Sequence, residues 1–344
     1  MKTDLKSISA EETGEFVKEL CLEAYRADQI RQWLFKKMVT SFDEMTNISI
    51  SIRELLKEKA FITGIERVKK LVSVDTTEKY LFRLHDGNLI ESVLIPEKDH
   101  FTLCISSQAG CAMGCAFCHT AQQGFKRNLT PGEIIEQIIE TKRSMADPDR
   151  LTNIVLMGMG EPLANYKAVV TALNNMIDDS ALNFSRRKVT LSTSGLAPYI
   201  RKLGKDSPVN LAVSLNAGDD ETRNRLMPLN KTYNLKSLIA ACKEFPLPNR
   251  RMITFEYILI KGVNDRDEDA LKVAKLLRGL RAKINLIPLN PGPDPEMRAP
   301  SWDDMVRFQD ILAENHYTVI IRKSKGQDIL AACGQLRGKQ LTQF

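Results

Sequence analysis

The sequence predicts an α/β protein: a partial (βα)6-type barrel with a small N-terminal helical module and a β-hairpin extension. Beyond residue 100, apolar strand-like runs alternate with amphipathic helical patterns, which is typical of a parallel sheet. Six or seven such units in about 240 residues fit either a barrel or an open doubly wound sheet. The first run leads into a cysteine-rich loop rather than the Gly-x-Gly-x-x-Gly turn of dinucleotide-binding sheets, so the barrel is favoured.

The first 65 residues are expected to form the helical module. Apolar side chains recur there at the spacing of one helical face. Three stretches show this spacing: residues 14–20, 29–35 and 52–60.

A β-hairpin is expected next. Two alternating runs, residues 79–84 and 89–95, are joined by Asp86-Gly87-Asn88. Asp-Gly between two such runs is a strong hairpin signal. The chain therefore divides into three predicted parts: the module at residues 1–65, the hairpin extension at 66–100 and the barrel with a C-terminal segment at 101–344.

The elements of the barrel follow from apolar runs and helical periodicity. Strands are expected at residues 103–107, 153–157, 188–192, 210–215, 254–259, 283–288 and 317–322. Helices are expected at 131–144, 166–176, 235–245 and 268–277. The first helix opens with Thr130-Pro131-Gly132-Glu133, a threonine N-cap followed by proline and, three residues on, a glutamate that can complete a capping box.

Composition argues against secreted and membrane proteins. The first twenty residues are rich in charge and lack an apolar core, and no apolar run is long enough to span a bilayer. We therefore expect a cytoplasmic protein without membrane contact. Seven cysteines, mostly scattered, do not resemble a disulfide framework.

The net charge of +6 is concentrated in the barrel. Residues 1–50 carry 7 basic and 9 acidic side chains and residues 51–100 carry 9 of each, so the excess lies beyond residue 100. Basic clusters occur at 126–127, 186–188, 250–251, 322–325 and 337–339. Each alone is typical of a solvated face, but their recurrence is what a polyphosphate-binding surface needs.

Three cysteines with the spacing Cys-x3-Cys-x2-Cys indicate an iron-sulfur cluster. They are Cys111, Cys115 and Cys118. A fully ligated cubane needs four thiolates, so three leave one iron open to a substrate. The alternatives are a structural zinc site completed by His119 or a distant cysteine, and thiols that are merely buried. Zinc motifs usually come as two Cys/His pairs, and no second pair exists in this sequence.

This loop resembles the signature of radical S-adenosylmethionine (SAM) enzymes, whose open iron binds SAM. Further segments narrow the resemblance to the RlmN/Cfr group of rRNA adenine methyltransferases over nearly the full chain, and to its branch that methylates adenine C2. The segments are residues 103–111, 120–125, 157–162, 191–195 and 332–336.

The resemblance implies a set of SAM contacts at strand ends. They are Gly160, Glu161, Ser192, Ser214, Leu215, Asn216 and Asn290. In a barrel, such positions point at the mouth of the site. Ordinary turn-forming and strand-end hydrogen bonding are the alternatives from the residues alone. Asn216 departs from the family, which usually has histidine there.

The resemblance also implies a mechanism with two cysteines outside the cluster. Adenine C2 is electron-poor and cannot attack the SAM methyl group as a nucleophile, whereas a carbon radical can add to it. A first SAM methylates Cys333, and a second generates the radical that activates the S-methyl group. After addition to the base, Glu91 accepts the C2 proton, and Cys104 resolves the protein–RNA thioether, which leaves a disulfide. From the residues alone, isolated cysteines are more often buried small apolar groups.

The cofactors implied are a 4Fe-4S cluster and two SAM molecules per turnover. The implied partners are 23S rRNA at its peptidyl transferase loop, tRNA beside the anticodon, and an external electron donor such as a flavodoxin-type reductant, with the enzyme acting as a monomer. Residues 1–65 would serve as an accessory RNA-binding module. Two alternatives remain: Cfr-type C8 methylation, which confers antibiotic resistance, and a non-catalytic iron-sulfur RNA-binding or redox-sensing protein. An adenosine that is single-stranded or flipped out is the expected target, because C2 is poorly reached within a helix.

Overall fold

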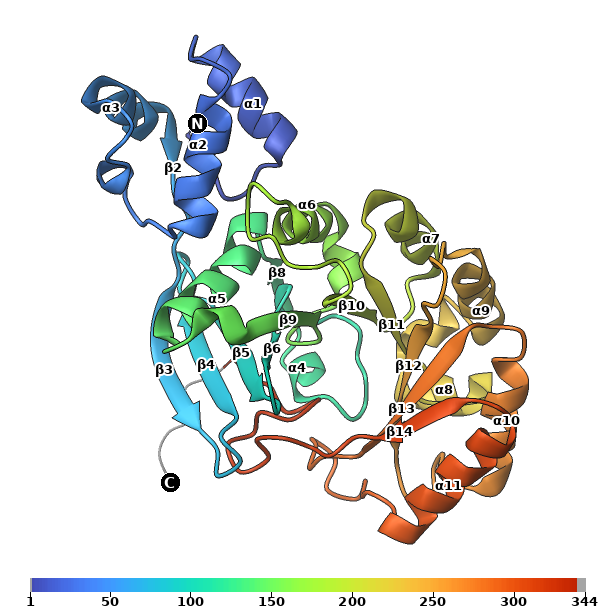
Figure 1. Cartoon of the computed structure of the whole chain (residues 1–344). Coiled ribbons are helices and arrows are strands. Elements are labelled where there is room, and N and C mark those ends of the chain that lie inside the picture. Colours follow the sequence, from blue (N-terminus) through green and yellow to red (C-terminus); the bar gives the residue numbers. More distant parts are fainter. Residues whose placement is uncertain (1, 339–344) are drawn as a thin grey trace.

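The computed structural model describes residues 2–338, which form a mixed ten-stranded sheet with helices on its outer side (Figure 1). The strand order is β14-β13-β12-β11-β10-β9-β6-β5-β4-β3, so β3 and β14 are the two edges. A sheet that curls with free edges is an incomplete barrel, and the predicted fold class is confirmed. Lys339, the last residue of one predicted basic cluster, lies outside the described residues.

Seven strands of the sheet run parallel and follow one another in chain order. They are β6 (Phe101–Cys104), β9 (Leu151–Leu156), β10 (Val189–Thr193), β11 (Asn210–Ser214), β12 (Ile253–Leu259), β13 (Ala282–Pro288) and β14 (Thr318–Ile321). All seven match predicted strands. Their regular order follows from the βα crossovers, which place each new strand beside the last.

Helices connect these strands and cover the outer face of the sheet (Figure 1). The four predicted ones are α5 (Pro131–Ser144), α6 (Tyr166–Ile177), α9 (Leu235–Glu244) and α10 (Asp267–Leu276). Three further helices were not predicted from the sequence: α7 (Ala197–Asp206), α8 (Asp220–Leu226) and α11 (Trp302–Glu314). The seven residues of α8 are too few to show a period, whereas α11 buries Met305, Phe308 and Leu312 at a helical spacing that could have revealed it.

The antiparallel strands continue the same sheet. They are β3 (Glu66–Val72), β4 (Glu78–Arg83) and β5 (Leu89–Pro96), and β5 pairs antiparallel with β6. The predicted hairpin between β4 and β5 is present. Gly87 at its turn has φ +82°, a backbone conformation that glycine adopts without strain.

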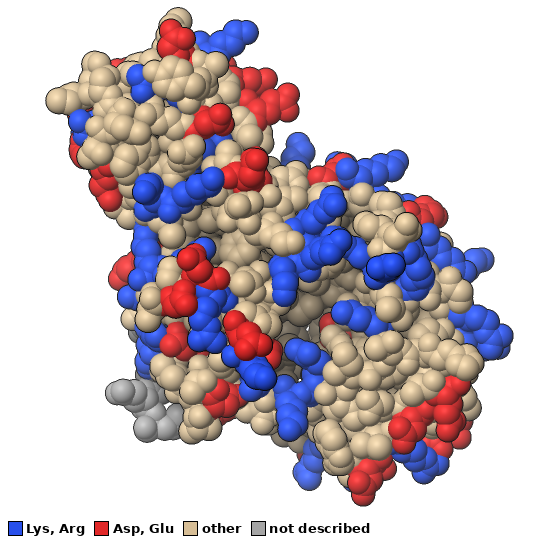
Figure 2. Space-filling view, in the orientation of Figure 1, with Lys and Arg blue, Asp and Glu red and all other residues tan. Residues whose placement is uncertain are grey.

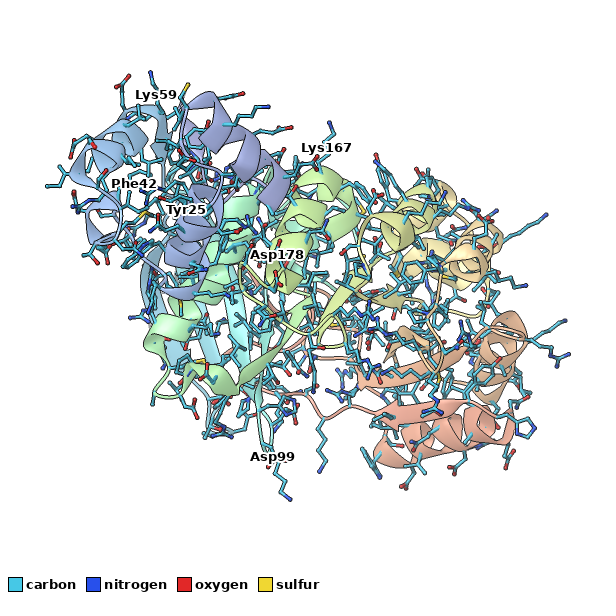
Figure 3. The ribbon with its side chains drawn as sticks, turned by 45° about the horizontal axis from the view of Figure 1, so that its top comes forward. Tyr25, Phe42, Lys59, Asp99, Lys167 and Asp178 are labelled. Atoms are coloured by element: carbon cyan, nitrogen blue, oxygen red, sulfur yellow. The ribbon has the colours of Figure 1, made fainter. Side chains whose placement is uncertain are left out.

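The N-terminal module packs against the outer side of α5 and α6. It contains β1 (Thr3–Asp4), α1 (Ala10–Glu19), α2 (Arg26–Arg31), a π-helical turn (Gln32–Lys36), α3 (Ile50–Lys59) and β2 (Ala60–Phe61), with a 3-10 turn at Phe42–Glu44. Figure 3 shows Tyr25, Phe42 and Lys59 in this module and Asp178 close to where it meets the barrel. Arg31, buried in the module, donates to Ser180 at 2.8 Å and to Asn175 at 3.0 Å and lies 3.4 Å from Asp178.

The two faces of the parallel sheet differ in polarity. On the outer face, side chains such as Leu191, Val213 and Ile284 are fully buried beneath the helices. Neighbouring positions across the strands share the inner face because side chains alternate along a strand. One inner layer is Cys104, Val155, Thr190 and Asn210, and another is Ser214, Glu256, Asn285 and Ile320. The inner face is therefore largely polar, as an active-site surface would be.

Short elements complete the chain. They are β7 (Gln108–Gly110), β8 (Phe125–Asn128), α4 (His119–Gln122) and the 3-10 turns Pro148–Arg150, Pro162–Asn165 and Pro228–Lys231. Between residues 2 and 338, no helix combines the length and apolar character needed to cross a membrane.

Candidate active site

The cysteine loop lies between β7 and α4 and is held in a tight turn. Gly110 has φ +77°, and a Cβ atom there would stand 2.0 Å from the carbonyl oxygen of Gly124. The backbone N–H of Cys111 donates to that same oxygen at 3.1 Å. Glycine is thus required beside the first cysteine, because any side chain would collide with the backbone of β8.

The three thiols of the loop lie near one another in a poorly solvated place. Desolvation raises the pKa of Cys111 to about 12, and it also raises that of Cys115, where the charges of Cys118 and Cys111 add to the effect. Within residues 2–338, no group of three or more His, Cys, Asp or Glu side chains is arranged to hold a single metal ion. In a 4Fe-4S cluster, however, each thiolate binds a different iron. The geometry therefore fits a multi-iron cluster better than a lone zinc ion.

Cys104 and Cys333 lie on the same inner side of the sheet, close enough for the charge of Cys333 to raise the pKa of Cys104, in addition to the larger effect of burial. Cys104 is buried at the end of β6, whereas Cys333 is accessible to solvent. Desolvation, followed by the charge of Glu256, raises the pKa of Cys333 to about 11. Cys333 thus combines an exposed residue with a sulfur that the surrounding protein desolvates. All seven cysteines, including these two, are free thiols in this structure.

The C-terminal segment brings Cys333 to the cysteine loop. The backbone N–H of His119 donates to the Gly334 carbonyl at 2.8 Å, and the Thr120 hydroxyl donates to the Leu336 carbonyl at 2.7 Å. Asn290 donates to the Cys333 carbonyl at 3.1 Å. These contacts fix the backbone around Cys333 immediately beside the helix that follows the third cysteine.

Glu91 holds the end of this segment. Its carboxylate accepts from the backbone N–H groups of Arg337 at 2.6 Å and Gly338 at 3.0 Å, both at Oε2. Its other oxygen, Oε1, pairs with Lys79 at 3.0 Å. Both side chains are buried, with 3% and 4% of their surface exposed. Glu91 thus contacts the segment that carries Cys333 across more than 240 residues of sequence.

The carboxylate of Glu161 is saturated by protein donors. It accepts from the Leu163 N–H at 3.0 Å, the Thr193 hydroxyl at 2.8 Å, and both the N–H and hydroxyl of Ser194 at 2.7 Å. Burial raises its pKa, which these hydrogen bonds oppose. Four donors occupy the lone pairs of two oxygens. Glu161 therefore organises the ends of β9 and β10, and the adjacent Gly160, with φ +98°, packs so closely on Gln108 that a Cβ atom there would stand 2.5 Å from its side chain.

Asn216 turns its side chain into the protein. It has φ +58°, a conformation that asparagine tolerates better than most residues. Its Oδ1 accepts from the Ile258 N–H at 2.8 Å, and its Nδ2 lies 3.2 Å from the sulfur of Met227. With 1% of its surface exposed, its side chain is committed to supporting β12. Leu215 beside it is also fully buried, so both could reach a ligand only through their backbone.

Ser192 and Ser214 are half-buried on β10 and β11. Asn290, which follows β13, is buried and bonded to Cys333 and, through its Oδ1, to Gln327 at 2.7 Å. The structure therefore places Ser192, Ser214 and Asn290 at or just beyond the carboxyl ends of β10, β11 and β13.

Several residues of the site were missed from sequence. Arg223 is fully buried and donates to the carbonyls of Leu215 at 3.0 Å, Ser194 at 2.7 Å and Ser214 at 3.0 Å. It joins the ends of β10 and β11 where ligand contacts are predicted. Lys79 and Glu256 were missed as well. Each is a single charged residue in an ordinary amphipathic pattern, so no local signal distinguishes it from a surface residue.

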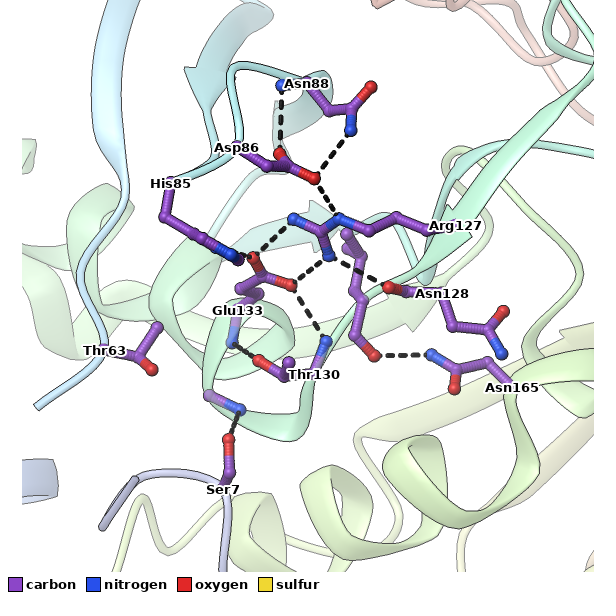
Figure 4. Close-up of polar contacts among 12 residues, drawn as sticks. Ser7, Thr63, His85, Asp86, Asn88, Arg127, Asn128, Thr130, Glu133 and Asn165 are labelled. Atoms are coloured by element: carbon purple, nitrogen blue, oxygen red, sulfur yellow. Dashed lines mark hydrogen bonds and ion pairs between the residues drawn. The ribbon is translucent and has the colours of Figure 1, made fainter. Parts of the chain in front are cut away.

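Arg127 fixes the ribbon that supports the cysteine loop (Figure 4). Its Nη1 and Nη2 atoms each donate to a different oxygen of Glu133 at 2.8 Å, while Nε donates to Asp86 in the hairpin turn. Glu133 also accepts from the Thr130 N–H at 2.9 Å, which completes the predicted capping box of α5. The network joins β8, the hairpin and α5 into one unit around the loop.

Comparisons with known proteins agree with this geometry. The model of the radical SAM superfamily matches residues 105–274, and that of the ribosomal RNA large subunit methyltransferase N-terminal domain matches residues 3–62. The chain is 56% identical to a dual-specificity RNA methyltransferase RlmN of Desulfosudis oleivorans, over 91% of this chain and 84% of that protein. Its identity to the protein of the same name in Syntrophus aciditrophicus is 50%, over 99% and 98%. A crystal structure of a radical SAM methyltransferase from Sphaerobacter thermophilus superposes with a TM-score of 0.91 at 41% identity, covering 98% of this chain and 100% of that one.

Proposed function

The chain belongs to the RlmN family of radical SAM RNA methyltransferases, and on this premise we propose that it methylates C2 of an adenosine in 23S rRNA and in tRNA. One observation carries the proposal beyond family membership. The segment 333–338 docks on the helix that follows the cysteine loop and on Glu91, so that one segment joins Cys333, which lies close to Cys104, to a buried carboxylate.

Cys111, Cys115 and Cys118 would hold a 4Fe-4S cluster and leave one of its irons open for SAM. Their shared loop, the close backbone turn at Gly110 and the absence of a fourth cysteine ligand in the loop fit that group. Bound together, the cluster and SAM supply radical chemistry, and two SAM molecules are used per turnover. A flavodoxin-type protein supplies electrons.

Three residues of the chain divide the work on the base. Cys333 carries the methyl group and forms the thioether with the RNA. Glu91 accepts the proton lost from C2, for which Oε1, whose one partner between residues 2 and 338 is Lys79, retains a lone pair. The Cys104 sulfur then attacks the Cys333 sulfur, which releases the methylated RNA and leaves a disulfide. The disulfide must be reduced before the next turnover.

The contacts proposed for SAM depend on which side-chain and backbone groups at the strand ends are free to face it. The side chains of Ser192 and Ser214 and the backbone of the segments 160–161 and 214–216 face the ligand. We assign backbone contacts to Glu161, Asn216 and Asn290, because the protein already satisfies their side chains. Asparagine in place of the family histidine therefore leaves the ligand site intact.

The organisation of the chain supports RNA as the substrate. Residues 1–65 form an accessory RNA-binding module, 66–100 extend the sheet, and 101–344 contain the barrel and the catalytic segment. The enzyme acts as a monomer in the cytoplasm. The relatives named above are RNA methyltransferases that carry the RlmN rather than the Cfr name, which favours C2 methylation over both alternatives.

The test is nucleoside analysis. Protein-free 23S rRNA and tRNA are incubated anaerobically with reconstituted enzyme, SAM and a reductant, digested, and examined by mass spectrometry. We expect 2-methyladenosine from wild type and none from Cys333→Ala, which should retain its iron. Formation of 8-methyladenosine would move the enzyme to the other branch, and full activity of Cys333→Ala would overturn the mechanism.

A further inference from the structure

Six basic side chains gather on three loops that precede β10, β12 and β13. They are Arg186, Arg187, Lys188, Arg250, Arg251 and Arg281, here named the arginine patch. Arg251 is half-buried and the other five are exposed. The sequence shows only two separate clusters, and the parallel sheet brings them together because the starts of neighbouring strands share one edge.

The arginine patch lacks partners of opposite charge. None of its members forms an ion pair within residues 2–338. Burial and then the charges of Arg186 and Arg187 lower the pKa of Arg251, which shows that residues from two loops repel one another. Repulsion of this kind is unfavourable unless a polyanion neutralises it.

Hydrogen bonds from side chains to backbone carbonyls hold these loops in place despite the repulsion. Asn210 donates to the Arg187 carbonyl at 2.8 Å, and Arg251 donates to the Pro208 carbonyl at 3.1 Å. Arg281 donates to the Leu247 carbonyl at 2.7 Å. These hydrogen bonds keep like charges close together, so the arginine patch is already arranged before any ligand binds.

The arginine patch lies at the end of the sheet opposite the predicted SAM contacts, at the other entrance to the polar inner face. The first inner-face residues beyond the patch are Thr190, Asn210 and Lys283. Further along the strands, the inner face carries Ser192, Ser214 and Glu256. Figure 2 shows Lys and Arg side chains gathered beside a central hollow, over the region where Figure 1 draws the loop from α6 to β10.

We propose that the arginine patch binds the backbone phosphates of the RNA strand that flanks the target adenosine. The inference rests on the proposed function and adds the surface and the direction from which the substrate approaches. Arginine suits phosphate because its guanidinium donates in a planar fork. A nucleotide that leaves its stack must be held by its neighbours, and phosphate contacts provide this without reading sequence.

The decisive variant is Arg186→Gln/Arg187→Gln/Lys188→Gln, because these side chains are exposed and donate no hydrogen bond that the fold requires. Binding of protein-free 23S rRNA and of unmodified tRNA transcript is measured between 50 and 200 mM salt. The logarithm of the binding constant falls with the logarithm of the salt concentration, and each lost phosphate contact makes this slope less steep by about 0.7 on single strands and about 0.9 on duplex. We expect the slope to fall by roughly 2 and affinity at 0.1 M salt to fall on the order of tenfold or more. Arg250→Gln, on a second loop, should lower the slope by about 1.

The matched control is Lys231→Gln/Lys236→Gln/Lys243→Gln, which removes the same charge from exposed positions on and before α9. It should leave the slope nearly unchanged. Equal slopes for the two triple variants would overturn the proposal, since only net charge would then matter. If wild type forms 2-methyladenosine but the patch variant binds RNA as tightly as wild type, the role of the patch is refuted and the proposed function stands. Wild type that neither binds nor methylates RNA would refute both. An effect on only one RNA would identify the substrate that uses this surface.

Discussion

Cys104 and Cys333 have unequal access to solvent, which suits unequal roles. Cys333 is accessible and borne on a segment held by backbone contacts, so it can meet a large substrate. Cys104 is buried in β6 and can reach only what Cys333 brings to it. The proposed division between carrier and resolving thiol therefore agrees with where each residue lies.

Replacing Cys104 should trap the substrate. Without the second thiol, the thioether between Cys333 and RNA cannot be resolved, so Cys104→Ala should accumulate a covalent protein–RNA adduct, seen with labelled RNA on a denaturing gel. Cys242→Ala, which alters a buried cysteine of α9, is the control and should turn over normally. Release of free 2-methyladenosine by Cys104→Ala at the wild-type rate would exclude Cys104 as the resolving residue.

Removing Lys79 should destabilise the protein strongly. Its partner Glu91 is buried, and loss of one member of a buried pair typically costs about 3–5 kcal/mol. Lys79 also donates to the Leu330 carbonyl at 3.1 Å, so the C-terminal segment should loosen as well. We expect the free energy of unfolding of Lys79→Met, measured in urea, to fall by about 3 kcal/mol. Lys70→Met, which breaks the neighbouring but partly exposed pair with Glu78, should cost at most about 1 kcal/mol. Similar losses in both variants would contradict this account.

At the scale of elements, the cysteine loop depends on the β7–β8 ribbon. The ribbon pairs Ala109 with Arg127, and Arg127 in turn binds Glu133 at the start of α5 (Figure 4). A loop that must hold three thiols around one inorganic group needs a rigid base, since small displacements change all three positions.

Gly110→Ala should therefore impair cluster binding. The substitution combines an unfavourable φ of +77° with a contact of 2.0 Å to the Gly124 carbonyl, so the ribbon must shift. We expect iron and sulfide content after anaerobic reconstitution to fall to less than half that of wild type. Gly87→Ala has the same kind of φ, +82°, but nothing within 4 Å, and should keep its iron. Full iron content in Gly110→Ala would show that the ribbon can yield.

At the scale of the whole molecule, buried charges fasten the N-terminal module to the barrel. Lys6 and Glu136 form an ion pair with 1% of each side chain exposed, and Lys6 also donates to the Thr63 carbonyl at 3.3 Å. Burial lowers the pKa of Lys6 and raises that of Glu136, while their mutual attraction opposes both shifts. Such a pair sets one orientation, because neither charge is tolerated there alone.

Breaking this pair should destabilise the docked state. Lys6→Met leaves Glu136 buried without its partner, so we expect a loss of about 3 kcal/mol in urea unfolding. The double variant Lys6→Met/Glu136→Met should recover most of it. Lys59→Met, an exposed position in the same module (Figure 3), should change the free energy of unfolding by less than about 1 kcal/mol. A loss in Lys6→Met no larger than in Lys59→Met would mean that the pair does not fix the module.

Local pattern alone determined much of this protein. The periods of strands and helices predicted the sheet, the Asp-Gly turn predicted the hairpin, and the spacing of Cys111, Cys115 and Cys118 predicted the cluster loop. These features depend on neighbours within a few residues, so the sequence displays them directly. The missed helix α8 is too short for such a display, whereas α7 buries Ala197, Ile200 and Leu203 at a helical spacing that could have revealed it.

Only the tertiary structure decided how the distant parts meet. Glu91 binds the backbone of Arg337 and Gly338, Asn216 turns its side chain into the protein, and two basic clusters join into one patch. Each outcome depends on the register of a curved sheet, which brings together residues far apart in sequence. Whether a charged residue is buried with a partner or left exposed is fixed by that packing, and a single sequence carries no local trace of it.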